Sequence, residues 1–145
     1  MPRNAPASYP RITPYLLYED VPAALNWLAK AFGFTERIRL AGSDGVVSHA
    51  EMTFGDGVIM LGFPGPDYRN PKRLGKATQL VHVYVDDVEE HFARAKGEGA
   101  TILAEVEDQA YGDRRYIAED PEGHQWTFAQ HVRDVSLEEW GATQA

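Results

Sequence analysis

The sequence has 145 residues, of which 43% are hydrophobic and 25% are charged, so it is neither disordered nor collagen-like. Its net charge of −8 argues against nucleic-acid binding, which needs a clustered basic surface. Cysteine is absent, which excludes disulfides, thiolate metal sites and a cysteine nucleophile.

No stretch approaches the roughly 18–20 apolar residues that a membrane-spanning helix needs. The first residues also have no apolar core of the kind that a secretory signal carries. We therefore expect a cytoplasmic protein that interacts with neither membranes nor nucleic acid.

The chain starts with a segment rich in proline and small residues, 1–10, which we expect to be a mobile arm. Residues 11–18 are apolar and aromatic and predict a strand, with its proline at an edge or at the strand start. Asp20 is a predicted helix N-cap. The helical spacing of apolar residues then predicts a helix over 21–32, and Gly33 ends it.

Three short apolar stretches with glycine-containing turns between them follow this helix. They predict strands at residues 35–40, 46–54 and 58–63. The first module, 11–63, therefore has the order strand, helix, strand, strand, strand. Residues 64–77 are rich in proline, glycine and charge and predict a linker.

The same order of elements repeats after the linker, in a second module over 78–131. Its predicted strand, helix and three strands lie at residues 79–85, 88–96, 101–106, 114–119 and 125–131. The tail, 132–145, has capping-box spacing at Ser136 and Glu139, which predicts a short helix. Two βαβββ repeats predict an α+β fold with a curved mixed sheet, and their open edges favour a homodimer.

Three stretches of the sequence carry a family resemblance: YLLYEDV at 15–21, HVYVDDV at 82–88, and YGDRR at 111–115 followed by DPEGHQW at 120–126. Together with the repeat, they resemble the vicinal oxygen chelate superfamily of glyoxalases, bleomycin resistance proteins and extradiol dioxygenases. The resemblance covers about residues 11–131 and looks closest to the PhnB-like branch. It implies the glyoxalase/bleomycin-resistance fold. The DPEG stretch itself has the composition of a structural turn.

The resemblance also implies where a divalent metal would bind in catalytic members, which use one ligand on the first strand and a glutamate on the last strand of each module. The corresponding positions here are Thr13, Met60, Leu80 and Thr127. None is a histidine or glutamate, and leucine and methionine do not bind a hard or borderline cation. We therefore expect no metal cofactor.

A displaced metal site is the alternative. Alternation along the strands places His49 and Glu51 on one face and His82 on the face of Leu80, so these side chains are candidate ligands for a lyase, isomerase or dioxygenase. Histidines on a half-buried sheet face are more often structural. His91, within the second helix, is expected to be solvated, and no nucleophile with an adjacent base is evident.

The concave face of the sheet is the expected ligand-binding surface, because alternation makes it apolar and aromatic with a few polar groups. The candidate ligand-binding residues are Tyr15, Glu51, His82, Tyr84 and Thr127. The tyrosines suit a planar or cationic ligand with a glutamate counter-charge, whereas Arg114 and Arg115 suit a carboxylate or phosphonate. The sequence leaves both open.

Three functional hypotheses follow from these patterns. The leading one is a metal-independent small-molecule-binding protein of the glyoxalase/bleomycin-resistance type, which sequesters a toxic compound or a similar ligand. The second is the metal-dependent enzyme with displaced ligands. The third is a structural or regulatory dimer without a ligand, since fold alone does not fix function.

Overall fold

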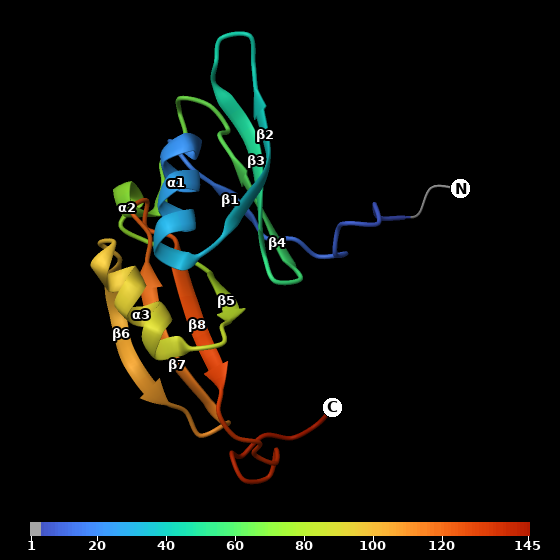
Figure 1. The fold of residues 1–145 in the computed structure, drawn as a ribbon, viewed down its shortest axis with the longest axis vertical. Coiled ribbons are helices and arrows are strands. Elements are labelled where there is room, and N and C mark those ends of the chain that lie inside the picture. Colours follow the sequence, from blue (N-terminus) through green and yellow to red (C-terminus); the bar gives the residue numbers. More distant parts are fainter. Residues whose placement is uncertain (1–3) are drawn as a thin grey trace.

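The structure is a computed structural model that describes residues 4–145. It has the predicted α+β fold, with two successive βαβββ modules (Figure 1). The elements are β1 (Tyr15–Leu17), α1 (Val21–Phe32), β2 (Thr35–Ala41), β3 (Val47–Phe54), β4 (Gly57–Gly62), α2 (Pro71–Leu74), β5 (Leu80–Tyr84), α3 (Val88–Gly97), β6 (Thr101–Asp108), β7 (Asp113–Glu119) and β8 (Gln125–His131). No helix of the described residues is long and apolar enough to cross a bilayer.

Each module forms its own mixed sheet rather than half of one continuous sheet. Sheet A has the strand order β1-β4-β3-β2, and sheet B has the matching order β5-β8-β7-β6. In both sheets the first strand runs parallel to the last, and the remaining pairs are antiparallel. Figure 1 shows α1 and α3 on the same side of the two sheets.

The signals for helix termini predicted the helices closely. The Asp20 side chain accepts a hydrogen bond from the backbone N–H of Ala23 at 3.0 Å, and Gly33 ends α1 with a φ of 83°. The strand predicted at 11–18 shortens to β1 because regular pairing starts only after Pro14, on the edge of sheet A.

Regions outside the two modules differ from their predictions in detail. The linker over 64–77 contains the one-turn helix α2. In the tail, Ser136 and Glu139 make the expected local hydrogen bonds, but the segment forms a turn rather than a helix. The predicted N-terminal arm lies partly outside the described residues, and residues 4–10 contain no helix or strand.

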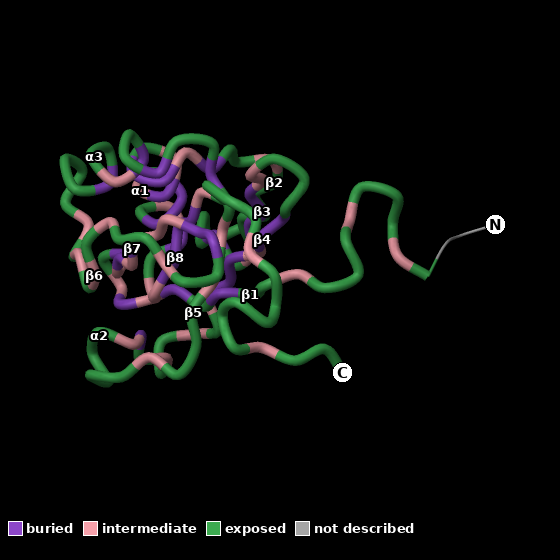
Figure 2. Tube along the Cα trace, turned by 90° about the horizontal axis from the view of Figure 1, so that it is seen from below, coloured by how far each residue is buried: buried purple, intermediate pink, exposed green. Residues whose placement is uncertain are grey.

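The two modules share one hydrophobic core, which lies between the helices and the sheets (Figure 2). Phe32, the last residue of α1, is fully buried at its centre. Its ring centroid lies 4.5 Å from that of Phe128 and 5.4 Å from that of Trp126, both on β8 of the other module. Aromatic contacts of this kind add to the stability gained from burying the apolar surface itself.

Side chains of α3 satisfy the last carbonyl groups of α1. Arg94 donates to the backbone oxygens of Lys30 and Ala29 at 2.7 and 3.0 Å, and Nε2 of His91 lies 2.8 Å from the backbone oxygen of Phe32. The last carbonyl groups of a helix have no partner within the helix, and of these three only the Ala29 oxygen also accepts from the backbone N–H of the C-cap residue Gly33.

The expectation that His91 is solvated is therefore wrong, because the helix face that carries it packs against the first module. A carbonyl oxygen only accepts, so Nε2 of His91 carries a proton and Nδ1 accepts from the Tyr116 hydroxyl at 2.6 Å. Burial lowers the pKa of His91 below its ordinary value.

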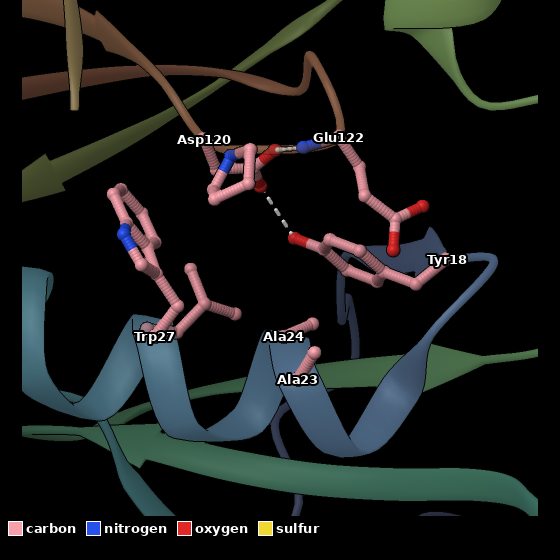
Figure 3. A pocket seen from close by; sticks show the side chains of 8 residues that line it. Tyr18, Ala23, Ala24, Trp27, Asp120 and Glu122 are labelled. Atoms are coloured by element: carbon pink, nitrogen blue, oxygen red, sulfur yellow. Dashed lines mark hydrogen bonds between the residues drawn. The ribbon is translucent and has the colours of Figure 1, made fainter. Parts of the chain in front are cut away.

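The DPEG turn between β7 and β8 is the second junction between the modules (Figure 3). Asp120 is only 2% exposed, and its Oδ2 accepts from the Tyr18 hydroxyl at 2.7 Å and from the Trp126 indole at 3.1 Å. Its Oδ1 accepts from the backbone N–H groups of Glu122 and His124. One carboxylate thus holds its own turn and Tyr18, the residue that follows β1.

Glu122 extends this junction to the linker. Its carboxylate accepts from the backbone N–H groups of Glu19 and Asp20 and from the Asn70 side chain, at 2.7–3.0 Å. Gly123 is required beside it: its φ is 92°, and an added Cβ atom would lie 2.4 Å from the backbone nitrogen of Lys72. The turn that the sequence presents as structural therefore joins both modules and the linker.

Replacing Asp120 by alanine leaves two buried donors, on Tyr18 and Trp126, without an acceptor. We expect a loss on the order of 3 kcal/mol in the free energy of unfolding, measured by urea denaturation. Asp56→Ala in the exposed turn between β3 and β4 is the matched control and should change stability by less than about 0.5 kcal/mol. Equal effects of the two substitutions would contradict this role of Asp120.

The buried His91 predicts a pH dependence of stability. Unfolded histidine takes up a proton near pH ~6.5, whereas folded His91 resists protonation, so its contribution is complete above that pH and falls as the pH drops toward the lowered pKa. Between about pH 6.5 and 5, the wild-type protein should lose more stability than His91→Gln. Parallel pH profiles of the melting temperature would contradict this assignment.

Candidate functional site

Each sheet has one face covered by the helices and one face turned away from them, which we call the open face. Along β1, Leu16 is buried toward α1, whereas Tyr15 on the other side is 48% exposed. Along β8, Trp126 and Phe128 lie in the core, and Thr127 between them belongs to the open face. The predicted alternation is therefore present, and the candidate ligand-binding residues share the open faces.

The open face of sheet B contains two neighbouring rows of side chains. In one row Tyr84 pairs with Ala129, which pairs with Arg115, and in the next row His82 pairs with Thr127. Tyr84 is 58% exposed, and its ring centroid lies 4.8 Å from that of His82 in an edge-to-face arrangement. Ala129, which lies between Tyr84 and Arg115 in this row, is fully buried.

A buried carboxylate holds Tyr84 in place. The Tyr84 hydroxyl donates to Oδ2 of Asp113 at 2.8 Å, and Oδ1 of Asp113 lies 2.8 Å from Nδ1 of His131. The hydrogen bond to Asp113 raises the pKa of Tyr84, and hydrogen bonds to Asp134 and Asp113 raise the pKa of His131. Tyr84 therefore presents a neutral, fixed aromatic ring to the open face.

The two arginines that the sequence offers as oxyanion ligands lie on opposite faces of β7. Arg114 is paired with Asp108, at 2.7 Å between Nε and Oδ1. Arg115 lies on the open face, and its Nη1 is buried without a hydrogen-bond partner among residues 4–145. A buried guanidinium donor without an acceptor is rare and costly.

A hollow of about 460 Å³ lies between β5 and β4, and Arg115 does not belong to its lining. It is lined by His82 and Tyr84 of β5, by Val58 and Ile59 of β4, and by Ile12 and Pro14 ahead of β1. Its lining combines apolar and aromatic groups with a few polar ones, the usual make-up of a small-molecule site.

The open face of sheet A contains a continuous hydrogen-bonded chain. The Tyr15 hydroxyl lies 2.8 Å from Nδ1 of His49, and Nε2 of His49 lies 2.8 Å from Oε2 of Glu51. An ionised carboxylate only accepts, so Nε2 carries the proton and Nδ1 accepts from the Tyr15 hydroxyl. The structure therefore brings together a phenol and a base, although no such pair is evident in the sequence.

Glu51 is 4% exposed, and its other oxygen is also fully engaged. Oε1 accepts from the Tyr9 hydroxyl at 2.7 Å and from Nη2 and Nε of Arg37 at 3.1 and 3.2 Å. Burial acts to raise the pKa of Glu51, but the hydrogen bonds from His49, Tyr9 and Arg37 outweigh it and lower the pKa. Arg37 is therefore the cation that pairs with Glu51. The sequence analysis had assigned Glu51 to pair with a cationic ligand instead.

The structure divides the five candidate ligand-binding residues between the sheets. It groups Tyr15 with Glu51 on sheet A and places His82, Tyr84 and Thr127 together on sheet B. Sequence reasoning missed Arg37 because the sequence alone does not show that β2 pairs with β3 beside Glu51. It missed Tyr9 because the arm has no periodic pattern.

The residues of the superfamily's metal positions do not fit a divalent cation. Met60 lies opposite Tyr15, Leu80 lies opposite Gln125, and Thr127 lies opposite His82. Within residues 4–145, no three histidine, aspartate or glutamate side chains are arranged to hold a metal ion. Of the displaced trio, His49 and Glu51 are bonded to each other on sheet A, and His82 lies on sheet B.

This donor set predicts that divalent ions do not stabilise the protein. Mn²⁺, Ni²⁺ or Zn²⁺ at 1,000 times the dissociation constant of a site would add about 4.1 kcal/mol of stability, so a metal site would be obvious in a thermal-shift assay. We expect no such shift with any of the three ions. A shift that His49→Ala or Glu51→Ala removes would contradict the expectation and support the displaced site.

Comparisons with known proteins agree with this architecture. The sequence profile of the Glyoxalase/Bleomycin resistance protein/Dioxygenase superfamily matches residues 10–128. An uncharacterised protein of Mycobacterium bovis is 35% identical over 135 residues, which cover 90% of this chain and 89% of that protein. A Mycobacterium tuberculosis relative has the same identity over 79% of its length.

Two solved structures are also similar. TioX from Micromonospora sp. ML1 matches with a TM-score of 0.70 and 34% identity, over 85% of this chain and 99% of TioX. The fosfomycin resistance protein FosX from Listeria monocytogenes shares the fold, with a TM-score of 0.63 and 14% identity over 90% of this chain and 97% of FosX. The repeat, the strand order and the profile match agree, and the chain belongs to the glyoxalase/bleomycin resistance protein/dioxygenase superfamily.

Proposed function

We propose that this protein binds a small molecule with a planar apolar part and an anionic group on the open face of sheet B, without a divalent metal. The observation that carries the proposal is the buried Nη1 of Arg115, which has no acceptor among the described residues. A carboxylate or phosphonate oxygen supplies the acceptor that this guanidinium lacks, and a charge-assisted hydrogen bond is stronger than a neutral one.

The neighbours of Arg115 support the planar part of the ligand. Tyr84 and Arg115 lie on either side of Ala129 in one row across the sheet. The planar part of the ligand stacks on the exposed ring of Tyr84, while its acidic group pairs with Arg115. Thr127, in the next row, offers a hydroxyl to the same ligand.

A homodimer closes the binding surface in this proposal. Large apolar side chains are exposed on both open faces, among them Leu17, Leu80 and Tyr84. The two modules of one chain pack through their helices, so β1 and β5 remain edge strands. Unpaired edges and exposed apolar patches favour association with a second copy.

We also propose the PhnB-like branch for this chain, on the motifs that resemble it, and a cytoplasmic location.

Ligand binding is tested with benzoate and phenylphosphonate in a thermal-shift assay. A ligand present at 100 times its dissociation constant stabilises the protein by about 2.7 kcal/mol. Arg115→Met should weaken binding by about 1.5–3 kcal/mol, because it removes the hydrogen bond to a charged group. Arg114→Met is the matched control on the opposite face and should bind as the wild type does.

Binding that is unchanged in Arg115→Met would contradict the proposed site. No stabilisation by either compound, or by wider aromatic and oxyanion libraries, would favour a structural or regulatory dimer instead.

The dimer is tested by size-exclusion chromatography with light scattering. We expect the mass of two chains, and we expect Leu80→Glu to give a monomer, because it places a charge on the exposed, apolar edge strand β5. Leu137→Glu makes the same substitution at a similarly exposed leucine in the tail and should leave the dimer intact. A monomeric wild-type protein at micromolar concentration would contradict the proposed assembly.

A further inference from the structure

Tyr15, His49 and Glu51 have the connectivity of a nucleophilic triad. A hydroxyl donates to a histidine nitrogen at 2.8 Å, and the other nitrogen of that histidine donates to a buried carboxylate at 2.8 Å. Such a set is recognised by its geometry and roles rather than by its order in the sequence. Tyr15 and His49 are 34 residues apart, and β4 lies between their strands.

The carboxylate end of this set is rigid. Arg37 and Tyr9 occupy Oε1 of Glu51, so only Oε2 is directed to His49. The ion pair with Arg37 keeps Glu51 charged, and a charged Glu51 stabilises the imidazolium that forms when His49 takes up a proton. Glu51 is therefore a positioning residue for His49.

The hydroxyl end is accessible. Tyr15 is 48% exposed, and it rests over Gly62, where an added Cβ atom would lie 2.6 Å from its ring and 2.9 Å from its hydroxyl oxygen. Tyr15 also lines a hollow of about 530 Å³, to which Arg69 and Lys76 contribute. Their cationic groups suit the negative oxygen of a tetrahedral intermediate.

We propose that Tyr15 is a nucleophile for acyl transfer from small aryl esters, with His49 as its general base and Glu51 as the group that positions His49. This activity goes beyond the proposed binding function, and it depends on neither Arg115 nor sheet B.

The proposed reaction has two steps. The Tyr15 oxygen attacks the acyl carbon while its proton passes to Nδ1 of His49; the bond to the aryl oxygen breaks, and the aryloxide leaves with that proton. Water then attacks the acyl-tyrosine and gives a proton to His49, and this proton returns to Tyr15 as the carboxylic acid departs. No oxidant, reductant or other co-reactant is needed.

Two other exposed tyrosines, Tyr84 and Tyr111, are internal controls for the reactivity of Tyr15. The Tyr84 hydroxyl is also half-exposed, but it donates to the carboxylate of Asp113, which is a much weaker base than imidazole. Tyr111 is similarly exposed and packs against Trp140. Only Tyr15 among these three donates to a histidine.

The test is incubation of the full chain with p-nitrophenyl acetate, followed by peptide mass spectrometry for acetyl-tyrosine and by absorbance for p-nitrophenol. Acetylation of Tyr15 should be at least about tenfold faster than that of Tyr84 or Tyr111, since a positioned general base contributes about 10²–10⁴-fold. His49→Gln should reduce the Tyr15 rate to that of the other two tyrosines. Glu51→Gln should lower the maximal rate with little change in half-saturation, and Tyr111→Phe should release p-nitrophenol as the wild type does.

Equal acetylation of the three tyrosines in the wild type would overturn the proposal. This comparison is made within one protein and does not depend on the folding of any variant. Acetylation of Tyr15 that persists in a folded His49→Gln protein would also overturn it. The Arg115 binding assay is separate, so an inert Tyr15 leaves the proposed binding function standing.

Discussion

The structure depends on the buried carboxylate of Asp120, which among residues 4–145 has no cationic partner and accepts from four hydrogen-bond donors. Two of these donors lie in its own turn, one is on β8, and Tyr18 comes from the first module. Because a buried charge without its donors is very costly, the turn and the entry to α1 keep one relative position. Together with the contacts between α1 and α3, this junction keeps both helices on the same side of the two sheets and leaves the opposite face of each sheet open.

The two open faces differ in their polar groups, and this difference separates their proposed roles. On sheet A, Arg37 and Tyr9 satisfy the Glu51 end of the Tyr15–His49–Glu51 chain, and the Tyr15 end is accessible. On sheet B, the buried Nη1 of Arg115 has no acceptor among residues 4–145. A complete proton path suits chemistry at Tyr15, whereas an unsatisfied donor suits the binding of an anion.

Features that depend on neighbouring residues in the chain were predictable from the sequence. Asp20, Gly33 and the helical spacing between them predict the bounds of α1, and the repeat predicts the order of elements along both modules. Contacts between distant segments were not: His91 is buried by Phe32 of the other module, and Tyr15 reaches His49 across β4. Alternation placed the candidate residues on the open faces, but the ion pair between Arg37 of β2 and Glu51 of β3 depends on strand pairing that the sequence does not show.

The central claim, an anion site at Arg115, is tested most directly by NMR of the arginine side chains during a titration with benzoate. The account predicts a shift of the Arg115 N–H signals, together with the backbone amides of Tyr84 and Ala129, while the Arg114 signals stay in place because Asp108 already pairs with it. Unchanged Arg115 signals at saturating benzoate, or shifts confined to Arg114 and the helices, would contradict it.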